Sequence, residues 1–88
     1  MNSKYDVFDK VYFFDEKNNQ ILQGEIKAIH KTVDSELYEI QVEPKNRQYV
    51  GQHWETNILA NFISEDLNSL KLKIKNIYKN KFKNLKVI

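Results

Sequence analysis

Hydrophobic and polar residues alternate through much of the first sixty positions, with the two-residue period that is typical of β-strands. The clearest stretch is 36–43, where Tyr38, Ile40 and Val42 are expected to face a core while the residues between them face water. An earlier run, 10–15, is rich in the aromatic and β-branched residues that favour strands. This part of the chain therefore predicts a mainly antiparallel sheet.

The run 21–31 is long for one flat strand. Ile26 and Ile29 break the strict alternation, and Gly24 lies just before them. The pattern predicts a bulge or a sharp bend that lets this strand serve two sheets.

Two shorter strands complete the predicted sheet. Residues 48–50, which are followed by a glycine, predict a fourth strand, and residues 52–59 are expected to hold one short helical turn and a fifth strand. Five short, bent strands around a small core predict a minimal barrel over residues 8–60, in a mainly β (α+β) fold.

From residue 64 onward the hydrophobic spacing changes to three and four residues, which is typical of an amphipathic helix. Ser64 is expected to cap this helix, with Glu65 and Asp66 in the first turn, where carboxylates interact favourably with the helix dipole. No proline or glycine follows, so the sequence predicts one long helix over residues 64–86. Its apolar stripe consists of Leu67, Leu70, Ile74, Ile77, Tyr78, Phe82 and Leu85.

Length and composition narrow the class of protein. The 88 residues are enough for one small core, and we expect residues 1–88 to fold as a single domain. The chain has no cysteine, which excludes a disulfide scaffold and thiolate chemistry. The apolar run 11–14 is too short for a signal peptide or a membrane span, so we expect a cytoplasmic protein with no membrane partner.

The net charge of +2 conceals a strong separation of charge. Residues 67–88 contain seven lysines and no acidic residue, whereas residues 1–66 contain seven lysines or arginines and twelve acidic residues. The formal charge is therefore +7 on the predicted helix and −5 on the rest of the chain. Such a distribution favours binding to a charged partner.

Several segments follow one another in a recognisable order: residues 11–13, 21–26 with Ile29, 38–40, 55–59 and 62–67. This order resembles the small SH3-like (Tudor/KOW-like) barrels of bacteria and their phages. The resemblance rests on pattern rather than on an invariant motif. It implies a non-enzymatic binding module, such as a phage accessory protein or an inhibitor of a host nucleic-acid-targeting complex of the CRISPR-Cas type. The long lysine-rich helix is an addition that the family does not need.

The lysines of the predicted helix are the first candidate site. Lys75, Lys79 and Lys83 are spaced by four residues and should lie on one line along the helix, where they would contact the phosphates of RNA or DNA. Two other outcomes stay open: a solvated helix face, or a helix that lies on Glu39 and Glu43 of the acidic body. The full set of predicted binding lysines is Lys71, Lys75, Lys79, Lys83 and Lys86.

The end of the apolar stripe is a candidate interface. A helix of twenty residues is about 30 Å long, which is more than the width of a minimal barrel. Tyr78, Phe82 and Leu85 would then overhang and bind a second copy in a helix-paired homodimer, or an acidic groove of another protein. The alternative is a helix that folds back over an open end of the barrel in a monomer.

Aromatic residues form the third candidate, because rings on a small barrel can bind peptides or bases. Rim or core packing is the alternative. The residues that could supply such a surface are Tyr12, Phe14, Tyr49 and Trp54. Tyr12 and Phe14 alternate with Val11 and Phe13, so one of these pairs should lie outside the barrel.

Catalytic and metal sites are not predicted. His30 and His53 lie on different predicted elements without the spacing of metal ligands, and the chain has no glycine-rich phosphate loop. We therefore expect a protein without enzymatic activity, cofactor or metal. It would bind a protein or a ribonucleoprotein, or alternatively RNA or DNA directly.

Overall fold

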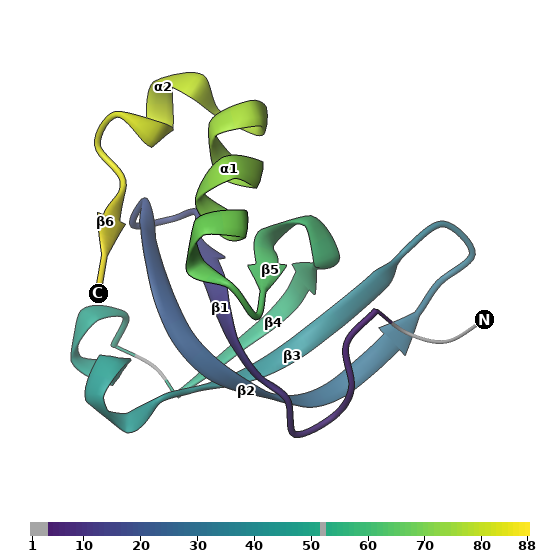
Figure 1. The fold of residues 1–88 in the computed structure, drawn as a ribbon. Coiled ribbons are helices and arrows are strands. Elements are labelled where there is room, and N and C mark those ends of the chain that lie inside the picture. The colour runs from purple at the N-terminus through teal and green to yellow at the C-terminus, as the bar shows by residue number, and fades with distance from the viewer. Residues whose placement is uncertain (1–3, 52) are drawn as a thin grey trace.

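The computed structural model describes residues 4–51 and 53–88. They form a curved sheet, followed in the chain by the helices α1 and α2 (Figure 1). Two short 3₁₀ helices are named η1 and η2. In chain order the elements are β1 (Lys10–Asp15), β2 (Gln20–Lys31), β3 (Glu36–Val42), η1 (Pro44–Tyr49), β4 (Trp54–Leu59), η2 (Ala60–Phe62), β5 (Ile63–Ser64), α1 (Leu67–Ile77), α2 (Lys79–Phe82) and β6 (Lys86–Val87).

The strands form one sheet in the order β4-β3-β2-β1-β5, and β6 pairs with β2 outside this path. The pairs along the path are antiparallel, whereas β6 runs parallel to β2. β4 and β5 lie at the two ends of the path, so the curved sheet is not closed (Figure 1). The predicted mainly β fold with a helix after the strands is confirmed, but a closed five-stranded barrel is not observed.

β2 has the predicted irregularity, but it pairs with its neighbours within one sheet and does not serve two sheets. Its first half pairs with β1 and its second half with β3, and the register with β3 shifts between Ile26 and Ala28. At Gly24 a side chain would clash, because a Cβ atom there would lie 2.4 Å from Ile40 Cγ2 and 2.7 Å from the backbone oxygen of Gln41. Glycine therefore permits the close approach of β2 and β3 at the bend.

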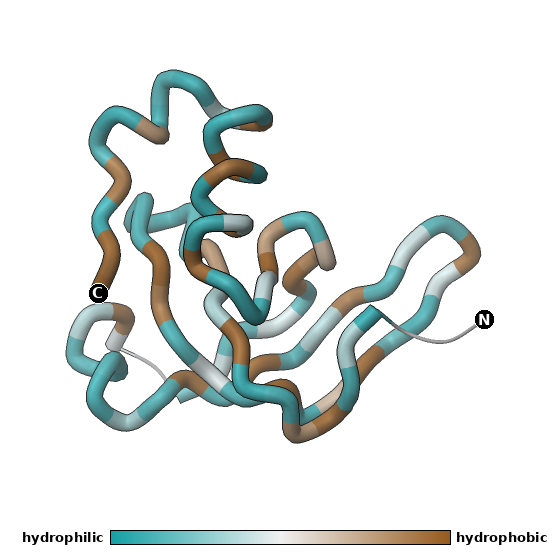
Figure 2. Tube along the Cα trace, in the orientation of Figure 1, coloured by the Kyte–Doolittle hydropathy of each residue, from teal (hydrophilic) through white to brown (hydrophobic). Residues whose placement is uncertain are grey.

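Two hydrophobic clusters lie on opposite faces of the β1–β2 pair. In the smaller one, Phe14 and Ile21 are register partners and pack against Leu70 and Ile74 of α1. Figure 2 shows hydrophobic residues recurring both along the strands and on α1. Alternation thus places one face of β1 in each cluster. The larger cluster consists of Tyr5, Val11, Phe13, Leu22, Ile26, Tyr38, Ile40, Val42 and Ile63.

Residues 48–50 do not form the predicted fourth strand, because they belong to η1 and its C-cap. Pro44 occupies the start of η1, where its fixed φ and missing N–H are tolerated. The side-chain oxygen of buried Asn46 accepts a 2.8 Å hydrogen bond from the backbone N–H of Gln23, which fixes η1 to β2. The helical turn expected before β4 comes after it instead, as η2, and Gln52 lies outside the described residues.

The start of α1 also differs from the prediction. The N-cap is Asp66, whose carboxylate accepts hydrogen bonds from the Ser69 hydroxyl at 2.7 Å and the Ser69 backbone N–H at 2.9 Å. These bonds hold the pKa of the Asp66 carboxyl below its usual value. Ser64 is not the cap, because it lies in β5 and is the register partner of Tyr12.

The prediction of one helix over residues 64–86 is wrong in its second half. Tyr78 leaves the helical conformation (φ −130°, ψ 75°) and separates α1 from the short α2. Its ring stacks on Phe62, with 6.0 Å between ring centroids, and lies 6.1 Å from Phe14. This change of direction brings Leu85 onto the smaller cluster, so apolar surface that a straight helix would expose is packed.

Candidate functional site

The basic tail, residues 67–88, holds the predicted binding lysines. Across residues 4–51 and 53–88, Lys81 is the one tail lysine with a carboxylate within ion-pair distance. The tail is therefore not neutralised by Glu39 and Glu43, and Glu39 instead lies 3.6 Å from His30. Among the described residues, no carboxylate lies within ion-pair distance of any of the five predicted lysines, Lys71, Lys75, Lys79, Lys83 and Lys86.

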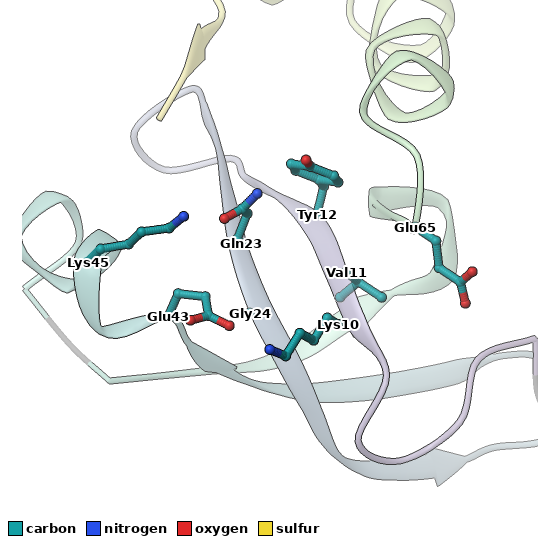
Figure 3. A pocket seen from close by; sticks show the side chains of 8 residues that line it. All are labelled: Lys10, Val11, Tyr12, Gln23, Gly24, Glu43, Lys45 and Glu65. Atoms are coloured by element: carbon teal, nitrogen blue, oxygen red, sulfur yellow. The ribbon is translucent and has the colours of Figure 1, made fainter.

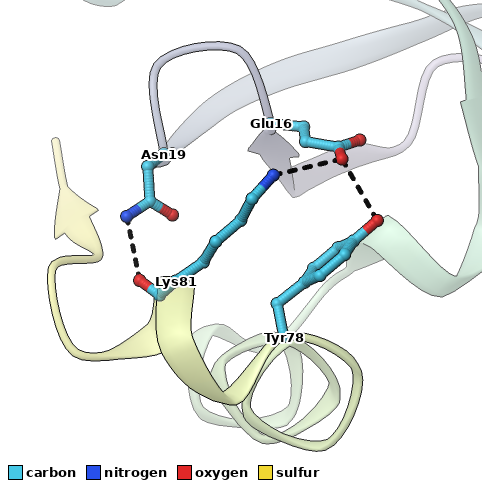
Figure 4. A network of polar contacts seen from close by, with 4 residues as sticks. All are labelled: Glu16, Asn19, Tyr78 and Lys81. Carbon is cyan, nitrogen blue, oxygen red and sulfur yellow. Dashed lines mark hydrogen bonds and ion pairs between the residues drawn. The ribbon is translucent and has the colours of Figure 1, made fainter.

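Lys81 is part of a polar network that holds the turn between α1 and α2 against the β1–β2 hairpin (Figure 4). The carboxylate of Glu16 accepts a 3.1 Å hydrogen bond from the Tyr78 hydroxyl and lies 3.2 Å from the Lys81 ammonium. The side-chain amide of Asn19 donates to the backbone oxygen of Lys81 at 2.8 Å. Burial and the neighbouring Glu16 raise the pKa of Tyr78. Lys81 thus positions the tail.

Lys73 also has an internal role. Its ammonium donates a 3.0 Å hydrogen bond to the backbone oxygen of Ile63, which also accepts a 2.8 Å hydrogen bond from the Tyr5 hydroxyl. Burial, and then the neighbouring charge of Lys4, lower the pKa of Lys73. The tail is therefore fixed to the sheet at two places, by Lys73 of α1 and by the network around Lys81 of α2.

The remaining tail lysines do not form the single line that was predicted. Lys75 lies on α1 and Lys79 on α2, with the break at Tyr78 between them, and Lys86 lies on β6. The Lys75 ammonium lies 5.9 Å from the ring centroid of Phe82. Because α1, α2 and β6 form an arch, the tail spreads its positive charge over a folded surface (Figure 1).

The three predicted interface residues pack within the chain. Tyr78 and Leu85 pack against the smaller cluster, and Phe82 is half-buried beside Lys75. A helix-paired dimer that used the Tyr78 ring would have to displace its contact with Phe62. The large apolar side chains that the tail does expose are Leu72, Ile77 and Val87.

Tyr49 and Trp54 are both exposed, each at 48%. Only Tyr49 is placed next to the tail, through Gln20, a residue that the sequence did not single out. The buried side-chain amide of Gln20 donates to the Tyr49 backbone oxygen at 3.1 Å, while the Gln20 backbone is the register partner of Lys86. Trp54 lies on β4, the strand at one end of the sheet, and is the register partner of Gln41 on β3.

A shallow hollow lies on the sheet face that carries the smaller cluster, between η1 and the start of α1 (Figure 3). Lys45 extends over it from η1, and half-buried Tyr12 rises from β1. Neither predicted pair lies outside, because Phe14 on the face of Tyr12 is buried under α1, and Val11 and Phe13 are buried in the larger cluster. Lys10 and Lys45 contribute positive charge, and Glu43 and Glu65 contribute an equal negative charge. This balance does not select an anion or a cation.

The described residues contain no group of three or more histidine, aspartate or glutamate side chains arranged to hold a metal ion. His30 lies on β2 and His53 lies in the bend before β4, and both are exposed. No helix among residues 4–51 and 53–88 is both long and apolar enough to cross a membrane. A scan of protein-family models and searches of curated proteins and of solved structures find no match to this chain.

Proposed function

We propose that this chain is a non-enzymatic binding module that docks on a nucleic acid, free or within a ribonucleoprotein, through its basic tail. The observation that supports this function is that the tail lysines have two different roles. Some make contacts within the chain, whereas others have no carboxylate within ion-pair distance among the described residues. Lys73 and Lys81 hold the tail on the sheet, so the exposed Lys79, Lys83 and Lys86 are available to an external anion. Clustered lysines without neighbouring acids favour phosphate contacts.

We propose that the sheet is an open variant of the SH3-like barrel. The path β5-β1-β2-β3-β4, the bend that divides β2 between two partners and the short η2 before β5 support this assignment. An experimental structure in which β2 pairs with β1 alone would contradict it.

The wider role that we propose is that of an accessory or inhibitor protein acting on a host nucleic-acid-targeting complex. The resemblance to small phage barrels and the separation between a basic tail and an acidic body motivate this role. Its test is co-purification with a nuclease or a ribonucleoprotein of the host. Failure to recover either would count against the inhibitor role and would leave direct nucleic-acid binding as the function.

The test of the proposed function is fluorescence anisotropy with a labelled RNA single strand and a labelled DNA duplex, between about 50 and 200 mM salt. The test variant carries Lys75→Gln, Lys79→Gln and Lys83→Gln in the tail. A matched control variant removes the same charge from exposed lysines of the body, with Lys10→Gln, Lys17→Gln and Lys31→Gln.

The wild-type protein should bind both probes with an affinity that falls steeply with salt, because released counterions drive phosphate binding. The tail variant should lower the salt slope by about 0.7 to 0.9 for each phosphate contact removed, and the body variant should leave the slope near that of the wild type. Equal losses in the two variants, or no binding at low salt, would reject the tail as a nucleic-acid surface.

A further inference from the structure

The end of the basic tail and η1 meet at Gln20, although about forty residues separate them in the sequence. The buried Gln20 side chain donates hydrogen bonds to Asp15 Oδ2 at 2.9 Å and to the backbone oxygen of Tyr49 at 3.1 Å. The backbone of the same residue pairs with Lys86 of β6. Figure 1 shows the C-terminal end of β6 beside η1.

Packing reinforces this junction. Val50, which ends η1, and Ile88, which follows β6, both pack against the larger cluster. The backbone N–H of Ile88 donates to the backbone oxygen of Ile21 at 3.0 Å. Tyr49 is therefore held by its backbone beside the end of the tail, while its side chain is half exposed.

The junction combines positive charge with an aromatic ring. η1 contributes Lys45 and Arg47, of which Arg47 donates to the Val42 backbone oxygen, and β6 contributes Lys86. Glu43 before η1 and Asp15 at Gln20 contribute negative charge. Cationic side chains that follow a nucleic-acid backbone, together with a ring on which an unpaired base can stack, are typical of single-strand binding. A duplex keeps its bases stacked inside and does not offer them to a surface ring.

Trp54 lies away from the junction at Gln20, although its side chain is as exposed as that of Tyr49. Its row across the sheet contains Gln41 and Glu25, because Gln41 is the register partner of both. Glu25 lies five residues after Gln20, which is about 17 Å along an extended strand. Trp54 is two strands further across the sheet from Glu25.

We propose that Tyr49 and Lys86 form a contact for single-stranded RNA or DNA, in which a base stacks on the Tyr49 ring and Lys86 binds the adjoining phosphate. This contact rests on the proposed function, and it adds a preference for single strands that lysines alone do not give. It also distinguishes Tyr49, which binds a base, from the equally exposed Trp54, which does not.

The test is anisotropy with a labelled oligouridine of about twelve nucleotides, within the size range of single-strand sites, beside a duplex of the same length. The variants are Tyr49→Ala, Tyr49→Phe and Trp54→Ala as the equally exposed control. The bond from Gln20 goes to the Tyr49 backbone, so removing the ring should leave the fold intact, as circular dichroism will check.

Tyr49→Ala should weaken oligouridine binding about tenfold, the lower part of the range for stacking on one ring. Tyr49→Phe should keep the affinity, Trp54→Ala should leave it unchanged, and duplex binding should not respond to Tyr49→Ala. Lys86→Gln should lower the single-strand salt slope by about 0.7.

Unchanged oligouridine binding by Tyr49→Ala, an equal loss in Trp54→Ala, or an equal loss on the duplex would overturn the contact. Duplex binding that depends on Lys75, Lys79 and Lys83 would meanwhile still support the proposed function. Absence of binding to either probe by the wild-type protein would overturn both.

Discussion

The curved sheet and the basic tail contain similar hydrophobic residues but owe their shape to different interactions. β2 pairs with β1 in an unbroken register and with β3 across one register shift, and the inward side chains of the three strands share one buried cluster. The tail consists of an eleven-residue helix, a four-residue helix and a two-residue strand, which contact the sheet mainly through the smaller cluster.

This difference shows why local pattern predicts one region better than the other. A strand in the sheet obtains its direction from hydrogen bonds to both neighbours, so alternation alone identifies its buried face. The tail changes direction at a residue whose partners, Phe14 and Phe62, come from elsewhere in the chain. A short helix in water depends on such tertiary packing rather than on propensity.

The largest expected effect comes from Phe14→Ala, because Phe14 is the buried side chain of β1 that joins the two regions. The substitution should lower the free energy of unfolding by about 3 to 5 kcal/mol, as for other buried aromatics. Urea denaturation should be followed by Trp54 fluorescence for the sheet and by circular dichroism for the helix. Both transitions should move together; loss of the helix signal alone would show that Phe14 supports only the tail.

Gly24→Ala tests the sheet alone. Its new Cβ atom would meet the backbone oxygen of Gln41, which cannot rotate away, so we expect a loss of about 1 to 3 kcal/mol, as in other overpacked cores. Gly51→Asn is the control, because Gly51 has a positive φ that Asn tolerates and its position has open space. Equal stability of the Gly24 variant and the wild type would contradict the observed approach of β2 and β3.

Tyr78→Ala tests the tail alone. Because the ring is only half-buried, the cost should be about 1 to 2 kcal/mol, below that of a core aromatic. Hydrogen exchange should accelerate after residue 77 while the amides of β1 and β2 stay protected. Tyr78→Phe keeps the stacking on Phe62 and should retain this protection. Faster exchange throughout the sheet would show that the two regions unfold as one unit.

The smallest effect is expected for Asp66→Asn. The hydrogen bonds to Ser69 lower the folded-state pKa of Asp66, so its stabilising contribution is present above the unfolded pKa, near 3.8, and is lost as the pH falls through the folded value. Asparagine also caps helices and does not titrate. The variant should therefore match the wild type near neutral pH and lose less stability in acid. Ser64→Ala, by contrast, should not change this acid dependence.

The sequence was sufficient for the sheet wherever a local pattern dictated the structure. The alternation at Tyr38, Ile40 and Val42, which are fully buried, and the irregularity around Gly24 both correspond to what the strands do. Composition also located the basic tail. These features depend on residue type and on neighbours in the chain.

Sequence reasoning failed where two segments compete for the same role. Ser64 is a good helix cap by type, but its pairing with Tyr12 places it in a strand and leaves capping to Asp66. Asn76, Asn80 and Asn84 weaken helix propensity along the tail and were a signal that the long helix would be interrupted.

The amino-acid order therefore determined that this chain builds an alternating sheet followed by a cationic amphipathic segment, because those properties are carried by residue type and spacing. The tertiary structure decided where that segment turns, because Glu16, Phe62 and Asn19 supply its partners from other elements. It also decided that Tyr49 and Lys86 both contact Gln20, the first through the Gln20 side chain and the second through the backbone, in contacts that no local period encodes.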